Sequence, residues 1–401
     1  PFYKTINNCA STNFKFSLNK MKYCVKCLEP STRPTTKFDN NGVCLSCISF
    51  QKNREVFDEN HRIDVLNQLL KKYKNKNNHK SKFDCVIGVS GGKDSVRQAL
   101  WVRDKLKLKP LLVCAAYPPE QITEVGANNL SNLISLGFDL IVSAPAPGFW
   151  RKAMKKGFFD GNYLRGPEIM LHSSQVHAAI KYGIKLIFWG ENPASVWNDT
   201  KTQLEEEYDG NALRYSNTLK NCDLTWMENF SNDKTKLIPY TYPTNKEFLK
   251  HEIKIVYLGW FWNDWSVINN AKISATYGLE SRKDHVSNTG DLYGIMALDE
   301  DWVILNQMIK YYKFGHGRVT DYLNAEIRYG NISREEAIPI VQKYDGSYHS
   351  KYVKSFCKYL DISENKFWHT VSTYVNKNLF TLNNKKYGKK FIPKFKVGKG
   401  I

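Results

Sequence analysis

The sequence contains no run of about 20 uncharged apolar residues, the length that a membrane-spanning helix needs. It also lacks the charged-then-apolar leader that directs secretion, and it shows no internal repeat. We therefore expect a cytoplasmic protein without membrane insertion. Because cytosolic disulfides are rare, most of the nine cysteines should be reduced or bound to a metal.

Negative charge is in short supply. The chain has 39 Asp and Glu residues against 58 Lys and Arg residues, a formal net charge of +19. Such a chain attracts polyanions, and nucleic acid is the first partner to consider. The excess can equally be spread over solvated faces; its two local concentrations, residues 71–82 and 385–399, have the composition of a linker and a tail. Charge alone does not distinguish tRNA from a phosphorylated small molecule.

Changes in composition divide the chain into five segments. They are a weakly ordered extension (1–20), a cysteine module (21–50), a helix with a basic linker (51–82), a central domain (83–245) and an aromatic-rich, mainly helical C-terminal region with a basic tail (246–401). In the first linker segment, apolar spacing predicts a helix over 54–73. In the C-terminal region we expect helices around 302–312, 318–328 and 333–343.

The central domain alternates between two patterns. Apolar runs predict strands at 83–89, 111–116, 138–142 and 185–189, and helical patterns cover 95–105, 125–136 and 169–182. Apolar strands that alternate with helices are typical of a parallel sheet with helices on both faces. The sequence therefore predicts an α/β fold with a doubly wound parallel sheet.

Two Cys-x-x-Cys pairs lie in the N-terminal module, separated by sixteen residues. Thiolates at this spacing can surround one Zn²⁺ tetrahedrally at about 2.3 Å. An iron–sulfur cluster is an alternative, since four thiolates hold either metal. We favour a structural zinc, which replaces a core that 30 residues cannot build. The predicted ligands are Cys24, Cys27, Cys44 and Cys47.

The hexapeptide Ser-Gly-Gly-Lys-Asp-Ser directly follows the first predicted strand, at positions 90–95. Its two glycines let the backbone approach an anion closely, and the next helix directs its positive end at the bound group. The serines add hydroxyl donors and Lys93 adds a cation. This is not a Walker A loop, because Ile87 stands six residues before the lysine and Asp94 follows it.

In its strand and helix context, this hexapeptide resembles the PP-loop of the N-type ATP pyrophosphatases, a superfamily with an adenine nucleotide alpha hydrolase-like fold. The resemblance implies that the loop binds the pyrophosphate of ATP and that AMP is transferred to a substrate oxygen. Ligands of such sheets bind at the carboxyl ends of the strands. The ATP-binding residues that this implies are Gly88, Ser90, Gly91, Gly92, Lys93, Asp94, Ser95 and Ala115.

From about residue 21 to the mid-340s, the chain resembles the N-acetyl sugar amidotransferases of the WbpG/PseA type, found in bacterial surface-polysaccharide (LPS O-antigen or related glycan) biosynthesis. The matching motifs are Met21–Cys24, Cys27, Thr32–Pro34, Phe38–Asp39, Gly42–Cys44, Ser90–Ser95, Gly190–Asn192, Tyr257–Trp260, Lys313–Arg318, Glu326–Arg328, Arg334–Ala337 and Lys343–Gly346.

This resemblance implies a reaction in two steps. The oxygen of an N-acetyl group on a nucleotide-linked diacetamido sugar attacks the α-phosphate of ATP, which gives an O-adenylyl imidate and pyrophosphate. Ammonia then adds to the activated carbon, AMP leaves, and an acetamidino group remains. Mg²⁺ neutralises the departing pyrophosphate.

Three residues are candidates for catalysis: Lys93, Asp94 and Glu191. Asp94 or Glu191 can ligate Mg²⁺. The alternatives are a helix cap for Asp94 and an ordinary ion pair for Glu191.

The candidate substrate-binding residues carry charge, an amide or an aromatic ring. The glycine-rich segment 313–318 resembles an anion-binding turn, although such a turn can also simply close a helix. Tryptophans are candidates for stacking on a base or sugar, although aromatic residues more often belong to a core. The candidates are Asn192, Arg165, Trp260, Lys313, His316 and Arg318.

The chain has no visible glutaminase, because the cysteines outside the metal site lack the context of a nucleophile. The resemblance implies that ammonia comes from a separate glutaminase pair similar to the two subunits of imidazole glycerol phosphate synthase. Nucleic acid is then not an expected partner.

Two other functions stay open. A PP-loop enzyme that modifies tRNA, a thiolase or a ligase, would explain the charge of +19. Against a thiolase, Cys114 and Cys222 stand alone, with no second Cys-x-x-Cys after the loop. A non-enzymatic alternative is a zinc-ribbon module that binds nucleic acid and retains a nucleotide pocket; it predicts salt-dependent tRNA binding without pyrophosphate release.

Overall fold

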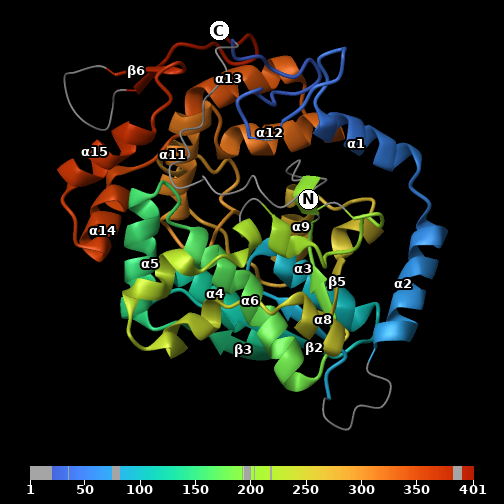
Figure 1. Cartoon of the computed structure of the whole chain (residues 1–401). Coiled ribbons are helices and arrows are strands. Elements are labelled where there is room, and N and C mark those ends of the chain that lie inside the picture. The colour runs from blue at the N-terminus through green and yellow to red at the C-terminus, as the bar shows by residue number, and fades with distance from the viewer. Residues whose placement is uncertain are drawn as a thin grey trace, which may run out of the picture.

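A computed structural model describes residues 20–34, 36–74, 82–191, 193, 200–202, 204–216, 219–382 and 391–401 (Figure 1). The strands are β1 (Cys85–Gly88), β2 (Pro110–Ala115), β3 (Asp139–Ser143), β4 (Leu186–Trp189), β5 (Lys254–Tyr257), β6 (Phe380–Leu382) and β7 (Phe391–Pro393). The α-helices are α1 (Leu45–Glu55), α2 (Glu59–Tyr73), α3 (Lys93–Asp104), α4 (Glu124–Ser135), α5 (Pro147–Phe159), α6 (Arg165–Tyr182), α8 (Asn245–Lys250), α9 (Val267–Ala275), α10 (Val286–Thr289), α11 (Val303–Phe314), α12 (Arg318–Tyr329), α13 (Arg334–Tyr344), α14 (Ser350–Leu360) and α15 (Glu364–Tyr374). Short 3₁₀ segments are η1 (Thr200–Thr202), η2 (Leu213–Tyr215), η3 (Lys220–Cys222), η4 (Thr225–Phe230), η5 (Lys234–Tyr240) and η6 (Leu258–Phe261).

The central sheet has five parallel strands in the order β3-β2-β1-β4-β5. The four predicted strands correspond to β1–β4 with ends that differ by at most two residues. The fifth strand, β5, lies beyond the domain boundary that we placed at residue 245, in a segment expected to be helical. It is only four residues long and leads directly into an aromatic run, so its pattern was too short to distinguish it from a buried helix.

Both faces of the sheet are covered by helices. Val86 and Val113 point into a core shared with α6, whereas the neighbouring Ile87 and Leu112 point into a second core shared with α3. Successive side chains on a strand face opposite ways, so these two cores lie on opposite faces. Burial on both faces explains why the strands read as continuous apolar runs. The mixed α/β fold with a parallel sheet is confirmed.

The segment 54–73, predicted as one helix, contains the last two residues of α1 and the whole of α2. The chain breaks between α1 and α2, where the side chain of Asp58 accepts a hydrogen bond from the amide of His61 and caps α2. The helix therefore starts at Glu59, and α1 belongs to the cysteine module.

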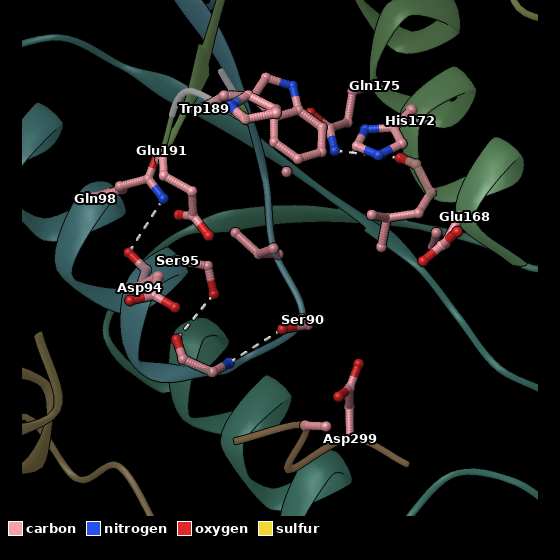
Figure 2. Close-up of a pocket in the computed structure, with 18 of the residues that line it drawn as sticks. Ser90, Asp94, Ser95, Gln98, Glu168, His172, Gln175, Trp189, Glu191 and Asp299 are labelled. Atoms are coloured by element: carbon pink, nitrogen blue, oxygen red, sulfur yellow. Dashed lines mark hydrogen bonds between the residues drawn. The ribbon is translucent and has the colours of Figure 1, made fainter. Parts of the chain in front are cut away.

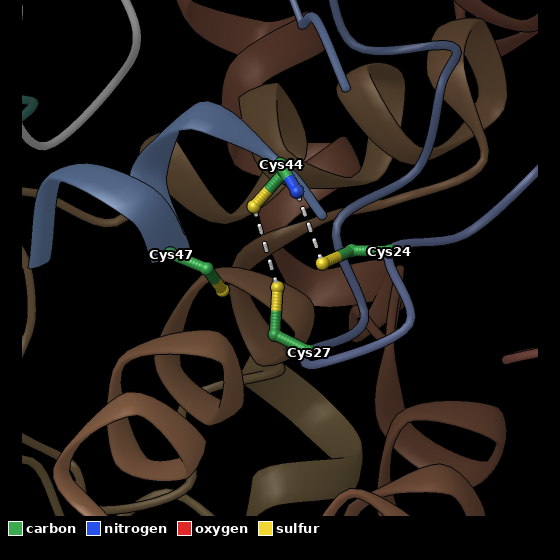
Figure 3. Close-up of side chains that lie close together, drawn as sticks. All are labelled: Cys24, Cys27, Cys44 and Cys47. Atoms are coloured by element: carbon green, nitrogen blue, oxygen red, sulfur yellow. Dashed lines mark hydrogen bonds between the residues drawn. The ribbon is translucent and has the colours of Figure 1, made fainter. Parts of the chain in front are cut away.

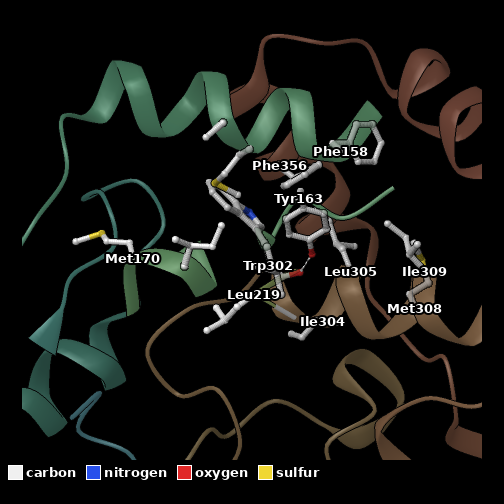
Figure 4. Close-up of a cluster of buried hydrophobic side chains, with 14 of the residues drawn as sticks. Phe158, Tyr163, Met170, Leu219, Trp302, Ile304, Leu305, Met308, Ile309 and Phe356 are labelled. Atoms are coloured by element: carbon white, nitrogen blue, oxygen red, sulfur yellow. Dashed lines mark hydrogen bonds between the residues drawn. The ribbon is translucent and has the colours of Figure 1, made fainter. Parts of the chain in front are cut away.

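The C-terminal helices pack onto the sheet domain through one apolar cluster (Figure 4). Phe158 of α5 and Tyr163 meet Trp302, Leu305 of α11 and Phe356 of α14 there, and the hydroxyl of Tyr163 donates to the carbonyl of Trp302. The helices expected around 302–312, 318–328 and 333–343 correspond to α11, α12 and α13. Within the described residues, no helix combines the length and the apolar character needed to cross a bilayer.

Candidate active site and cysteine cluster

A cavity of about 580 Å³ lies at the carboxyl ends of β1, β2 and β4. The strand order places β2 and β3 on one side of β1, and β4 and β5 on the other. The cavity therefore sits where the direction of strand order reverses, the usual ligand position in an open parallel sheet.

The Ser/Gly loop forms one wall of this first cavity (Figure 2). Helix α3 begins at Lys93 with Gly92 as its N-cap, so the start of the helix lines the cavity. Seven of the eight predicted ATP-binding residues line it: Gly88, Ser90, Gly92, Lys93, Asp94, Ser95 and Ala115.

The eighth residue, Gly91, packs against α4. Its φ is +78°, and a Cβ there would lie 2.8 Å from the backbone of Asn129 and Leu130. A glycine is thus required at position 91 because two backbone segments approach closely there. Gly91 itself does not line the cavity.

The carboxylate of Asp94 is held from two sides. Lys93 Nζ lies 2.7 Å from Asp94 Oδ2, and Asn270 Nδ2 of α9 donates to Asp94 Oδ1 at 2.6 Å. Arg97 Nη1 in turn donates to Asn270 Oδ1 at 2.6 Å. Asp94 is the second residue of α3 and does not cap it; the cap position belongs to Gly92.

Asn270 was missed from the sequence. It is fully buried beside Ala271 and Ser274, and the hydroxyl of Ser274 donates to the carbonyl of Lys93 at 2.6 Å. Nothing in the spacing of α9 distinguishes an asparagine that orients a carboxylate from one in an ordinary helix contact. Only the packing of α9 against α3 shows its role.

Glu191 follows β4 and faces the same cavity. Burial, and after it the charge of Asp94, raises the pKa of its carboxyl to about 7 against the opposing effect of Lys93. Two carboxyl groups that repel each other beside the Ser/Gly loop fit a hard divalent cation such as Mg²⁺. The adjoining candidate Asn192 lies outside the described residues.

Helix α6 supplies a polar face that sequence reasoning overlooked. Glu168, His172 and Gln175 all line the cavity, at the i, i+4, i+7 spacing of one helix face (Figure 2). Burial raises the pKa of Glu168 to about 8 and lowers that of His172 to about 4.

Several polar atoms of residues that line this cavity have no hydrogen-bond partner among the described residues. They are Gln98 Oε1, His172 Nδ1 and Gln175 Oε1, all buried. The ring of His172 lies 4.5 Å from that of Trp189. Buried polar atoms normally have partners, so this wall fits a ligand with its own donors and acceptors, as a nucleobase has.

A second cavity of about 790 Å³ adjoins the first. Its walls come from α1, α12 and the aromatic segment between β5 and α9. The residues that line both cavities are Arg33, Lys93, Asp94, Glu191, Met296 and Ala297. The two cavities therefore meet at the three residues predicted to be catalytic.

The predicted substrate-binding residues are distributed unevenly. Trp260 and Arg318 line the second cavity. Lys313 donates to the carbonyl of Gly161, and Arg165 lies 3.3 Å from the carboxylate of Asp223. Neither of these two residues, nor the buried His316, is among the residues that line the two cavities, so substrate contact by Lys313, Arg165 and His316 stays a prediction.

The turn before α12 already holds an anion from the chain itself. Asp345 accepts hydrogen bonds from the amides of Gly317 (2.7 Å) and Val319 (3.0 Å) and from the hydroxyl of Thr320. These donors bind a buried carboxylate whose pKa burial raises to about 6. In this structure the turn serves to start α12.

The four predicted cysteine ligands form a buried cluster (Figure 3). Their sulfur atoms all lie within 4.8 Å of one another, and Cys27 Sγ is 3.7 Å from Cys44 Sγ. Thiolates around one tetrahedral Zn²⁺ are about 3.8 Å apart, a separation that follows from the Zn–S distance of about 2.3 Å. The arrangement has room for a single ion and is consistent with zinc.

The cysteine module is anchored by residues from far along the chain. Arg334 Nε donates to the carbonyls of Cys24 (3.3 Å) and Cys27 (3.1 Å), and its Nη2 donates to the carbonyl of Gly398. Arg328 Nη2 of α12 lies 3.9 Å from Cys27 Sγ. The module therefore packs on α12 and α13 (Figure 1).

Comparison with known proteins adds a family for the C-terminal part. Residues 280–396 match the model of the C-terminal domain of WbpG-like LPS biosynthesis proteins. No curated protein matches the chain. The matched segment includes Arg318 and Asp321 of the second cavity and Asp299 of the first. This match supports a relationship to the WbpG family and indicates an enzyme connected with LPS biosynthesis.

Proposed function

We propose that the protein is an ATP-dependent amidotransferase that converts an N-acetyl group of a nucleotide-linked diacetamido sugar to an acetamidino group. The observation that carries this proposal is the meeting of two cavities at Lys93, Asp94 and Glu191. One cavity has the loop that suits the phosphates of ATP, and the other has room for a second substrate. An adenylyl transfer needs both substrates to approach one point.

In the first step, the acetamido oxygen attacks the α-phosphorus, and the bond to the bridging oxygen of pyrophosphate breaks. Lys93 and the start of α3 stabilise the charge that develops on pyrophosphate. Asp94, oriented by Asn270, would hold Mg²⁺, which neutralises the phosphates when bound.

In the second step, ammonia adds to the imidate carbon, the carbon–oxygen bond breaks, and AMP leaves. The attacking nitrogen must lose a proton. Glu191, with a pKa of about 7, is suited to accept it near neutral pH. Ammonia comes from a separate glutaminase pair in this proposal, and the protein works in the cytoplasm on precursors of a surface glycan such as LPS O-antigen.

The test is an assay with ATP, Mg²⁺, ammonium and a panel of nucleotide-linked diacetamido sugars. We expect AMP and pyrophosphate to form in step with a sugar whose mass shows oxygen replaced by NH. If no sugar reacts but tRNA triggers pyrophosphate release, the proposal is overturned in favour of a tRNA-modifying PP-loop enzyme, the alternative that the net charge of +19 favours.

A further inference from the structure

We propose that the second cavity is the acceptor pocket, that Arg318 binds an anionic phosphate of the acceptor there, and that the cysteine module has a second role as a wall of this pocket. The proposal rests on the proposed function only for the identity of the acceptor. The features that carry it are unpaired donors, an excess of positive charge, aromatic faces and the position of α1.

Arg318 is a buried cation that forms no close pair within the described residues, although its charge acts to lower the pKa of the Asp299 carboxyl. It is the first residue of α12, its side chain is 7% exposed, and it lines the second cavity. It makes no hydrogen bond and no ion pair with any residue in the described part of the chain. Burying an arginine in this state is costly, so the site fits an anion that enters from the cavity.

Two further residues of the lining have donors in excess of acceptors. Trp262 Nε1 and Arg328 Nε are buried without hydrogen-bond partners among the described residues, and both residues line the second cavity. Indole and guanidinium groups have no acceptor atoms. A lining of this kind suits a ligand that presents acceptors, as phosphate oxygens and a sugar do.

The charge of the lining points the same way. Six Lys and Arg residues line the second cavity against four Asp and Glu residues. Glu29 and Asp321 are already engaged, because both accept from Arg33 and Asp321 also lies 2.5 Å from Lys310 Nζ. The charge left for a ligand is positive, which favours an anion.

Aromatic rings provide flat apolar faces beside these charges. Phe50 of α1 lies edge-to-face on Tyr329 of α12, with ring centroids 4.9 Å apart, and Trp262 lies 5.1 Å from Trp265. The hydroxyl of Tyr329 donates to the carbonyl of Trp265 and ties the two pairs together. Such faces accept a planar base or the apolar side of a sugar ring.

Part of this wall depends on the cysteine cluster. Helix α1 has Cys44 at its N-cap and contains Cys47, so the cluster fixes where the helix begins. Phe50 and Arg54, further along α1, line the cavity. Arg328 of α12 lies 3.9 Å from Cys27 Sγ of the cluster and also lines the cavity.

The cavity volume of about 790 Å³ falls within the usual range for small-molecule pockets, about 300–1,000 Å³. Anion-binding donors, a ring-binding wall and an opening onto the catalytic residues fit one class of ligand, a nucleotide-linked sugar. Its phosphate would contact Arg318, and its N-acetyl group would reach the junction with the first cavity.

Calorimetric binding tests this assignment in the full-length protein. The probes are uridine diphosphate N-acetylglucosamine and cytidine monophosphate N-acetylneuraminate, each titrated with and without a saturating non-hydrolysable ATP analogue. We expect at least one probe to bind while the analogue is bound. Arg318→Met, which keeps the bulk of the side chain, should weaken that probe by about 10- to 100-fold and leave the analogue's affinity unchanged.

Arg151→Met is the matched control, since Arg151 is half-exposed and lies outside both cavities. Trp262→Phe, which keeps a ring but removes the Nε1 donor, gives a second measurement should Arg318→Met lower the melting temperature. The assignment is overturned if neither probe binds, if the probe displaces the ATP analogue, or if both Arg318→Met and Trp262→Phe bind like Arg151→Met.

Failure of this pocket assignment can be distinguished from failure of the proposed function. Normal amidination combined with unaltered probe binding by both Arg318→Met and Trp262→Phe refutes the pocket but leaves the proposed function standing. Loss of probe binding in Arg318→Met, combined with no turnover of any sugar by the unaltered protein, supports the pocket and refutes the amidotransferase.

Discussion

The two cavities of this protein are built in opposite ways. Four consecutive residues, Gly92–Ser95, together with Ser90 form one wall of the first cavity. The second cavity draws its walls from positions between Glu29 and Tyr329, on elements that meet only in the folded chain. Under the proposed function, phosphate binding would therefore depend on one loop, whereas the choice of acceptor would depend on the whole fold.

The largest effect should come from breaking the junction that the two cavities share. Asp94→Asn removes the charge that Lys93 and Asn270 orient, and we expect pyrophosphate release to fall by about 100- to 1,000-fold. Acceptor binding should persist. Asp104→Asn is the control, because Asp104 lies on the same helix, 43% exposed and paired with Arg103. Equal rates for the two variants would refute a catalytic role for Asp94.

Loss of the metal should weaken ligand binding in the second cavity and leave binding in the first cavity unchanged. Cys44→Ser removes one candidate metal ligand at the residue where α1 begins, so the wall of the second cavity should loosen. We expect acceptor-probe affinity to fall by about 10- to 100-fold, while the ATP analogue binds normally. Elemental analysis and amide hydrogen exchange in α1 follow the change. Cys222→Ser, outside the cluster, serves as the control; identical exchange in both variants would contradict this role of the module.

A subtler change tests how the sheet domain orients its carboxylate. Asn270→Ala deletes the hydrogen bond to Asp94 Oδ1, and a bond to a charged group is worth about 1.5–3 kcal/mol. Turnover should fall by about 10- to 100-fold with ATP affinity preserved. Asn269→Ala is the matched control, because the side-chain amide of Asn269 donates to the carbonyl of Asp264 and not to Asp94. A drop only in ATP affinity would show that Asn270 serves binding alone.

The smallest effect concerns stability. Burial raises the pKa of Glu168 to about 8, above the ordinary value of 4.5, so the folded protein binds more protons than the unfolded chain between these values. The free energy of unfolding should therefore fall as pH rises from about 4.5 to 8. Glu168→Gln should raise the melting temperature by a few degrees at pH 8 and leave it unchanged at pH 4.5.

Glu335→Gln is the control for this pH effect, since that side chain is 78% exposed. Thermal melts of the two variants across pH provide the comparison. A gain from Glu168→Gln that is the same at both pH values would contradict ionisation as its cause.

The same contrast explains what the sequence could predict. Strands β1–β4, the loop at 90–95 and the cysteine ligands were predictable because each depends on neighbours in the chain: apolar runs, a glycine turn, paired thiols. The pattern of Glu168, His172 and Gln175 was also present in the sequence, at helical spacing, and was overlooked.

Other features required the folded chain. Strand β5 was too short to recognise, and Asn270 acts only because α9 packs on α3. Lys313 has a charge and a glycine-rich context like those of Arg318, five residues later. Yet Lys313 donates to the carbonyl of Gly161 while Arg318 faces the second cavity. The composition of a segment cannot predict which of two nearby cationic side chains will line a pocket in the folded protein.

The anchoring of the cysteine module by α12 and α13 has a consequence for synthesis on the ribosome. Cys24 is made about 300 residues before Arg334, which at 5–20 residues per second corresponds to a delay of roughly 15–60 s. During this interval the nascent chain already has the Ser/Gly loop and the four clustered cysteines. It does not yet have the arginines of α12 that line the second cavity. An unfinished polypeptide thus has the Ser/Gly loop but an incomplete second cavity, so under the proposed function turnover of ATP with a sugar would begin only when the C-terminal helices have emerged and packed.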